Sequence, residues 1–137
     1  MELDIQIKKG LGNILFGMPV EEVVALLGEP TQVESLDNAA DETTTVLHYE
    51  DDGLSLFFEG DNPTLQCIDL SNTDATLFGA EIFDMTEAEI VQLMISHNYV
   101  EQDIENEDWG ERRITFNEGN IDFYLDQNDL LSIIWGI

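Results

Sequence analysis

The chain has 137 residues, 43% of them hydrophobic, and carries 30 Asp and Glu against 4 Lys and Arg, for a net charge of −26. These values predict one compact domain, and the charge argues against binding to nucleic acid or anionic membranes, which are themselves negative. We recognise no membrane-spanning run and no secretory signal, and the single cysteine cannot form an internal disulfide, so we expect a protein of the bacterial cytoplasm with no cofactor.

The first helix is predicted over residues 19–27, after a short strand at residues 3–7 in which apolar and polar side chains alternate. Pro19 suits the first helical position, where its missing N–H is not needed. Gly28 offers a left-handed C-terminal residue, and Pro30 prevents the helix from continuing. The apolar residues recur at helical spacing and predict one buried stripe, formed by Val20, Val23, Val24 and Leu27.

A second helix is predicted over residues 86–96. Thr86 and Glu89 have the spacing of a capping box, in which each side chain bonds the backbone N–H of the other residue. Asn98 can end the helix because asparagine tolerates a left-handed conformation. The predicted stripe of this helix consists of Ile90, Leu93, Met94 and His97.

Three strands are predicted after each helix, because apolar and polar side chains alternate there and indicate one buried and one mostly solvated face. The Asp-Gly pair at residues 52–53 is typical of a hairpin turn with positive φ. Two acidic segments, 34–45 and 101–111, lie outside this pattern, and we predict a loop at the first of them. The predicted strands cover residues 43–50, 54–59, 65–70, 112–117, 121–126 and 130–135.

The two halves of the chain repeat one pattern. Residues 16–70 can be laid over residues 83–135 with an offset of 67, which falls to 65 after a loop that is two residues longer in the first copy. Such repetition predicts that one structural unit occurs twice and that the copies pack on each other. We therefore predict a single compact α+β domain of two helix-plus-three-strand antiparallel meander repeats, at about 10–71 and 77–137, with the helices on one face of the sheet or sheets.

The opening of the first repeat, at residues 16–31, reads Phe-Gly-Met-Pro-Val-Glu-Glu-Val-Val-Ala-Leu-Leu-Gly-Glu-Pro-Thr. It resembles the Gly-Met-Thr-x-x-Glu-Val-x-x-Leu-Leu-Gly-x-Pro pattern of BamE/SmpA-type domains, and it is similar to the unit that is doubled in β-lactamase-inhibitor proteins. The resemblance implies helical hairpins packed on an antiparallel sheet and a function in binding other proteins. The chain departs from the pattern at Pro19, has one predicted helix per repeat rather than two, and shows no lipidated cysteine, which argues against a role in outer-membrane assembly.

Trp109 is the residue that we single out as a candidate binding anchor. It stands in the acidic segment 105–111, where no core position is evident, and tryptophan is enriched at the anchors of protein interfaces. We predict that Trp109 contacts a basic protein partner, with Asp108, Glu107 and Glu111 as its acidic surround. The alternative is that Trp109 folds back over the edge of the sheet.

Other polar residues have simpler structural interpretations. His48 lies near Glu50 and could hold a metal ion with nearby carboxylates, but no second histidine is close in sequence. Cys67 could act as a nucleophile only with a lowered pKa, and the surrounding acids favour a raised one. The acidic turns lack the Asp-x-Asp-x-Asp-Gly spacing of an EF-hand. We therefore predict no metal site and no catalytic residue.

Phe57 and Tyr124 occupy equivalent positions of the two repeats, on the strand face opposite the predicted core. This second apolar row could pack one repeat against the other or form an exposed binding face. We favour packing between the repeats.

The leading functional hypothesis is a non-enzymatic protein-binding domain, either an inhibitor or an immunity-type protein that covers a basic partner. Electrostatic attraction would speed the association of such a pair. Two alternatives stay open. One is a housekeeping or scaffold domain, and the other is an enzyme or a weak divalent-metal-binding protein that uses His48 and nearby carboxylates.

Overall fold

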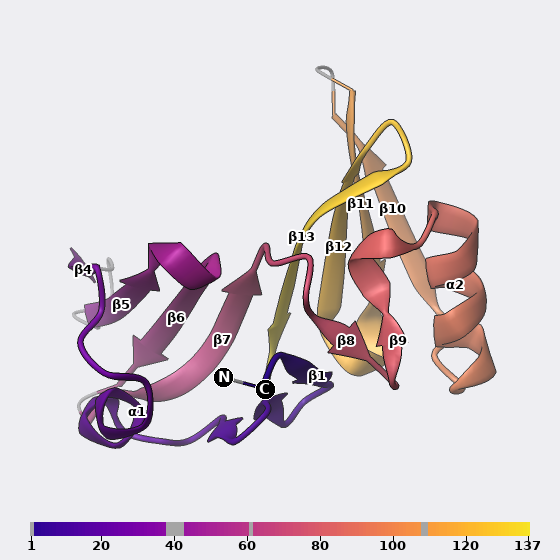
Figure 1. Cartoon of the computed structure of the whole chain (residues 1–137). Coiled ribbons are helices and arrows are strands. Elements are labelled where there is room, and N and C mark those ends of the chain that lie inside the picture. The colour runs from indigo at the N-terminus through magenta and orange to yellow at the C-terminus, as the bar shows by residue number, and fades with distance from the viewer. Residues whose placement is uncertain (1, 38–42, 61, 108–109) are drawn as a thin grey trace.

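The computed structural model describes residues 2–37, 43–60, 62–107 and 110–137. Among these residues, 48% lie in β-strands and 21% in helices of any kind. The strands form two sheets, of eight and five strands, and the described part of the chain holds two short α-helices. The predicted α+β class is therefore wrong, because the protein is mainly a β-structure (Figure 1).

The eight-stranded sheet is the main element of the fold, and all its neighbouring strands are antiparallel. Each half of the chain contributes a meander of four strands rather than the predicted three. The strand order is β10-β11-β12-β13-β7-β6-β5-β4, so the two meanders meet at β7 and β13 and run outward from there. The strands are β4 (Gln32–Asp37), β5 (Thr43–Tyr49), β6 (Leu54–Glu59), β7 (Thr64–Leu70), β10 (Gln102–Asn106), β11 (Glu111–Phe116), β12 (Ile121–Asp126) and β13 (Asp129–Gly136).

Two strands of this sheet, β4 and β10, were not predicted from the sequence, and they form its outer edges. All five residues of β10 are exposed, and β4 is exposed at most of its described positions. A strand without a buried face needs no hydrophobic alternation, and this explains why the segment 34–45 resembled a loop. Carboxylates such as Glu34 and Glu105 at these edges oppose pairing with another sheet.

The five-stranded sheet has the order β3-β2-β1-β8-β9 and is built from very short strands. The hairpins β2–β3 and β8–β9 occupy equivalent positions of the two repeats, and β1 lies between them, parallel to β8. Gly10 is required in the first hairpin, because a Cβ atom there would lie 2.0 Å from the carbonyl oxygen of Ile14. The strands are β1 (Asp4–Gln6), β2 (Gly10–Leu11), β3 (Ile14–Leu15), β8 (Thr76–Leu77) and β9 (Ala80–Glu81).

Both predicted helices are confirmed, as α1 (Val20–Leu27) and α2 (Glu87–Ser96). The capping box of α2 is also confirmed. The Glu89 N–H donates to Thr86 Oγ1 at 3.3 Å, and the Thr86 N–H donates to Glu89 Oε1 at 2.9 Å. Helix α1 begins one residue later than predicted, so Pro19 is its N-cap rather than its first helical residue, with φ −74° and ψ 163°.

One face of the large sheet carries the hydrophobic core and packs against α1, α2 and the small sheet. Trp135 is 1% exposed, and its indole N–H donates to the carbonyl oxygen of Gly10 at 3.1 Å. This hydrogen bond joins the large sheet to the small one. The buried residues of the core include Leu56, Phe58, Ile68, Leu70, Ile90, Met94, Phe116, Phe123 and Ile133.

A pseudo-two-fold axis relates the two meanders. The register of β7 and β13 places Asp69 opposite Ile134, and these two residues are also each other's equivalents in the repeat. The axis therefore passes beside them. The register shifts at equivalent points on both sides of the axis, after Phe57 in one half and after Tyr124 in the other. Bulges of this kind re-aim side chains and are common near binding sites.

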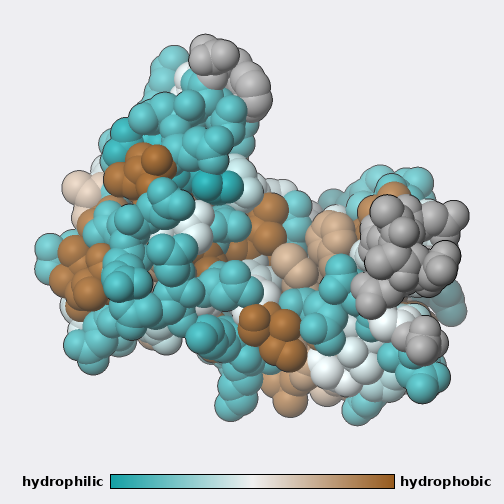
Figure 2. All heavy atoms as spheres, turned by 180° about the vertical axis from the view of Figure 1, so that it is seen from behind, coloured by the Kyte–Doolittle hydropathy of each residue, from teal (hydrophilic) through white to brown (hydrophobic). Residues whose placement is uncertain are grey.

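The surface of the protein is mainly hydrophilic. Figure 2 shows apolar residues in small separate patches on the side that it presents. The large apolar side chains that are exposed in the described residues are scattered along the chain, as Leu26, Val33, Leu36, Phe78, Ile95, Val100, Ile104, Leu131 and Ile137. No described helix is long and apolar enough to cross a membrane.

Replacing Trp135 by Phe is expected to lower the free energy of unfolding by about 2–4 kcal/mol, because it empties part of the core and leaves the Gly10 carbonyl without its donor. Urea denaturation followed by circular dichroism measures the change. The control is Leu131→Ala in the same strand, where the side chain is 44% exposed and a change below about 0.5 kcal/mol is expected. Equal losses in both variants would contradict the role given to Trp135.

Candidate functional site

Two of the four predicted anchor residues, Asp108 and Trp109, lie outside the described residues. The other two, Glu107 and Glu111, stand at the end of the β10–β11 hairpin, where the Glu107 N–H donates to the Glu111 carbonyl at 2.7 Å. This hairpin belongs to one outer edge of the large sheet. The structure gathers other polar side chains nearer the centre of the sheet.

We call the face of the large sheet that lies opposite the core the open face. Strand alternation places Phe57 and Tyr124 on it, and both are half-buried. The expectation that these aromatics pack one repeat on the other is wrong, because the repeats lie side by side in one sheet. The two rings therefore belong to one continuous face, on either side of β7 and β13.

A chain of hydrogen bonds crosses the first half of the open face. The ring of His48 lies between Ser55 and Glu34, with Nδ1 2.8 Å from Ser55 Oγ and Nε2 2.9 Å from Glu34 Oε1. A carboxylate can only accept, so Nε2 carries the hydrogen that Glu34 receives. In a neutral imidazole Nδ1 is then the acceptor, and the Ser55 hydroxyl donates to it.

Ser55, His48 and Glu34 are the residue types of a hydrolase triad, but the backbone around Ser55 does not suit nucleophilic catalysis. Ser55 lies within β6, which pairs with β5 on one side and with β7 on the other. The N–H groups of such a strand are engaged in the sheet ladder. They are therefore not available as an oxyanion hole, which acyl transfer requires.

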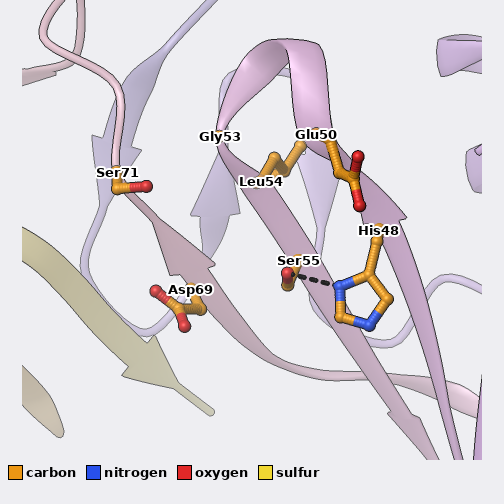
Figure 3. A pocket seen from close by; sticks show the side chains of 7 residues that line it. All are labelled: His48, Glu50, Gly53, Leu54, Ser55, Asp69 and Ser71. Carbon is orange, nitrogen blue, oxygen red and sulfur yellow. Dashed lines mark hydrogen bonds between the residues drawn. The ribbon is translucent and has the colours of Figure 1, made fainter. Parts of the chain in front are cut away.

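A pocket of about 250 Å³ opens beside this chain of hydrogen bonds (Figure 3). Asp69 and Ser71 lie on one side of it, His48 and Glu50 on the other, and Ser55 between them. His48, Ser55 and Asp69 come from β5, β6 and β7. Glu50 comes from the 3₁₀ turn Glu50–Asp52, and Ser71 directly follows β7. The lining residues are His48, Glu50, Gly53, Leu54, Ser55, Asp69 and Ser71.

Asp69 is the most unusual group of the pocket. It is partly buried on a central strand, and within the described part of the chain no group donates a hydrogen bond to its carboxylate. Burial raises the pKa of this carboxyl, and the nearby His48 offsets part of the rise. Carboxylates in proteins usually have a partner when they leave water, so the group is poised either to bind a proton or to meet a cation.

The second repeat carries different chemistry at the same positions. The equivalents of His48, Ser55 and Asp69 are Thr115, Asp122 and Ile134. The Thr115 hydroxyl donates to the Asp122 carboxylate. A pocket of about 210 Å³ is found there, with Asp122 and Ile134 among its lining residues. Asp122, one of the two side-chain carboxylates that line this second pocket beside Glu59, therefore has a donor, whereas Asp69 has none among the described residues.

Cys67 lies two residues from Asp69, also on the open face. Burial raises the pKa of its thiol to about 11, and the nearby carboxylates of Asp69 and Asp122 add to the rise. The thiol is therefore protonated at neutral pH, and thiolate, not thiol, is the nucleophilic form. This agrees with the effect that the sequence predicts for its acidic neighbours.

The metal-binding alternative for His48 receives no support from its surroundings. Both ring nitrogens already take part in hydrogen bonds. Across residues 2–37, 43–60, 62–107 and 110–137, no three His, Cys, Asp or Glu side chains come together in an arrangement that could hold a metal ion.

Sequence reasoning placed His48 on the wetter face but missed Asp69. A signal for it exists in the repeat. Ile68 and Leu70 are buried on the core face, so Asp69 points to the opposite face, and its repeat equivalent is the apolar Ile134. A charge at a position where the other copy has an isoleucine marks one of the places where the two repeats differ in chemistry.

The comparisons with known proteins describe the fold. The sequence matches no protein-family model and no curated protein. The structure is similar to the crystal structure of the uncharacterized protein yfeY from Escherichia coli. The TM-score is 0.60 at 12% sequence identity, and the match covers 100% of both chains. The two proteins thus share a fold over their whole lengths, which includes both repeats.

Replacing Asp69 by Asn is expected to raise the melting temperature at neutral pH, because it removes a partly buried charge that has no hydrogen-bond donor. Folding raises the pKa of Asp69, so protonated Asp69 favours the folded state. This stabilisation is complete below the pKa of the unfolded chain, about 3.9, and is lost as the pH rises through the higher pKa of the folded protein. The gain from Asn should therefore grow from about pH 4 to pH 7.

Thermal unfolding of the two proteins across this range measures the difference. The matched control is Asp122→Asn, which removes one charge but disturbs the hydrogen bond from Thr115 and is not expected to stabilise. A melting temperature that falls at pH 7 in Asp69→Asn would contradict the unpaired charge.

Proposed function

We propose that this chain is a non-enzymatic protein-binding domain whose open face binds a basic protein. The observation that carries the proposal is the combination of two half-buried aromatic rings, Phe57 and Tyr124, with carboxylates on neighbouring strands of the same face. Interfaces typically combine aromatic anchors at their centre with a polar rim.

The charge of the open face favours a cationic partner. Arg113, which strand alternation places there, pairs with Glu105 at 2.7 Å and so adds no free positive charge. A face of this kind attracts basic proteins over a distance set by the ionic strength, and it repels nucleic acid and anionic lipid. Alternation places these carboxylates on the face: Glu34, Glu59, Asp69, Asp103, Glu105, Glu111, Asp122 and Asp126.

The aromatic residues would supply contact area at low entropic cost. Burial together with Asp122 raises the pKa of the Tyr124 hydroxyl, so Tyr124 stays a neutral ring with a polar tip. Aromatic side chains have only two rotatable bonds and so lose little freedom on binding. Phe57 provides the equivalent ring in the first half.

The predicted anchor Trp109 belongs to the same proposal. Glu111 lies on the open face opposite Asp126, whereas Trp109 and Asp108 lie outside the described residues. A contact of Trp109 with the partner would add an aromatic anchor to the contact surface. We therefore keep Trp109, Asp108, Glu107 and Glu111 as part of the proposed binding surface.

Within this class, an inhibitor or immunity-type role fits best. A domain that covers a basic partner needs a fast association rate and a stiff surface, and the charge of −26 and the continuous sheet supply these two properties. The chemistry around Ser55 and Cys67 described above also favours binding over catalysis.

A triple variant of exposed open-face carboxylates, Glu59→Gln, Asp103→Asn and Asp126→Asn, is expected to weaken partner binding roughly tenfold, since each exposed ion pair contributes up to about 1 kcal/mol. The immobilised protein captures partners from a lysate of its source organism at about 50 mM and about 500 mM salt, and the higher salt should release most of the bound protein.

The control variant carries Glu21→Gln, Glu22→Gln and Glu81→Gln, which remove the same number of charges from elements that pack on the core side of the large sheet. It should retain the partner. A protein that is captured equally by both variants responds to net charge alone, and this result would refute the open face as the binding surface.

A further inference from the structure

We propose that the pocket formed by His48, Glu50, Ser55, Asp69 and Ser71 is a receptor for an alkylammonium group, such as the lysine side chain of a protein partner. The identity of the occupant as part of a protein rests on the proposed function. The chemistry of the pocket does not, because it follows from the groups that line it.

The pocket presents oxygen acceptors from several elements. Asp69 and Ser71 face Glu50 across a volume of about 250 Å³, with Ser55 between them (Figure 3). An ammonium group is a compact charge with three donors on a flexible stem, and it suits acceptors that converge from different directions. A guanidinium instead needs a planar pair of acceptors. A small metal ion needs several close ligands, and among the described residues no three His, Cys, Asp or Glu side chains come together to hold one.

The hydrogen-bond chain makes Ser55 an acceptor toward the pocket. When His48 is neutral, Glu34 holds the ring hydrogen on Nε2, and the Ser55 hydroxyl donates to Nδ1. The proton of Ser55 is thereby directed away, and its remaining lone pairs are left for another donor. Thus His48, together with Glu34 outside the pocket, leaves the neutral hydroxyl of Ser55 as an acceptor for a cation.

Asp69 supplies the negative charge that a bound ammonium group would neutralise. Its carboxylate lies partly out of water, and within the described residues it receives no hydrogen bond. A carboxylate in this setting destabilises the free protein. A bound ammonium would supply both the missing donor and the opposite charge.

The walls of the pocket are fixed before any ligand arrives. The Ser71 N–H donates to the Gly53 carbonyl at 2.8 Å, and Asn72 Nδ2 donates to the Asp52 carbonyl at 2.9 Å. Gly53 has φ 61°, and a Cβ atom on it would lie 2.3 Å from the Ser71 carbonyl oxygen, so only glycine permits this closure. Preformed walls reduce the entropy lost on binding.

The second repeat provides an internal comparison. There Ile134 replaces Asp69, and Thr115 replaces His48 and donates to Asp122. The strands are equivalent, but both side-chain carboxylates that line this second pocket already have donors, Asp122 from Thr115 and Glu59 from Thr44. The unpaired charge is therefore not a property of the fold itself, and it singles out the first pocket as the one built for a cation.

The test is a titration of the ¹⁵N-labelled full chain with n-butylammonium, followed by amide chemical shifts at fixed ionic strength and pH 7. We expect saturable shifts at Ser55, Asp69 and Ser71 with a Kd on the millimolar scale, which is usual for so small a ligand. Asp69→Asn should weaken binding at least tenfold, whereas Asp122→Asn, which removes the same charge, should stay within about twofold of the wild type.

Three results would overturn the proposal: equal binding by Asp69→Asn and the wild type, equal shifts with the neutral analogue 1-butanol, or unsaturable shifts spread over the whole acidic surface. The outcome is separable from that of the proposed function. Ammonium binding in the pocket without any salt-dependent protein partner would support the pocket and refute the partner. Partner capture through the open face without ammonium binding would support the proposed function and refute the ammonium pocket.

Discussion

The pairing of β7 with β13 is the contact on which the rest of the structure depends. Each half alone would be a four-strand meander with an apolar face and an unpaired inner edge, and sheets of this kind need further cover. The pairing removes both inner edges and joins two partial cores into one. Its register also sets Asp69 beside Ile134 on the pseudo-two-fold axis. Phe57 and Tyr124 lie on one face only because this join makes the face continuous.

The large negative charge acts on this frame in two ways. Self-repulsion opposes the compact state, so the apolar contacts between the sheets and helices must outweigh it. At the outer edges the same charge is useful, since Glu34 on β4 and Asp103 and Glu105 on β10 keep a second acidic chain from pairing there. The acidic edges thus restrict association with like copies while leaving the protein attractive to cationic surfaces.

Helices and inner strands could be predicted from the sequence because their buried faces impose a period. The bounds of β6 and β12 were predicted without error, and the capping box of Thr86 and Glu89 located α2. The edge strands have no buried face. In the small sheet the alternation at residues 3–7 did predict β1, but the other strands are two residues long, too short for a period to show. The pocket was missed for another reason. Ser55, Asp69 and Glu50 meet through strand register, and register is not readable from one strand at a time.

The duplicated frame shows which features the fold requires and which it merely permits. Positions that hold the frame keep their character in both copies, as Ile68 and Ile133 do in the core. At the axis the second copy has Ile134, so the frame accepts an apolar residue there, and the partly buried Asp69 of the first copy is not needed for folding. A charge that weakens the free protein, placed beside a histidine and a serine whose hydrogens are directed away from it, is best explained by what it would bind.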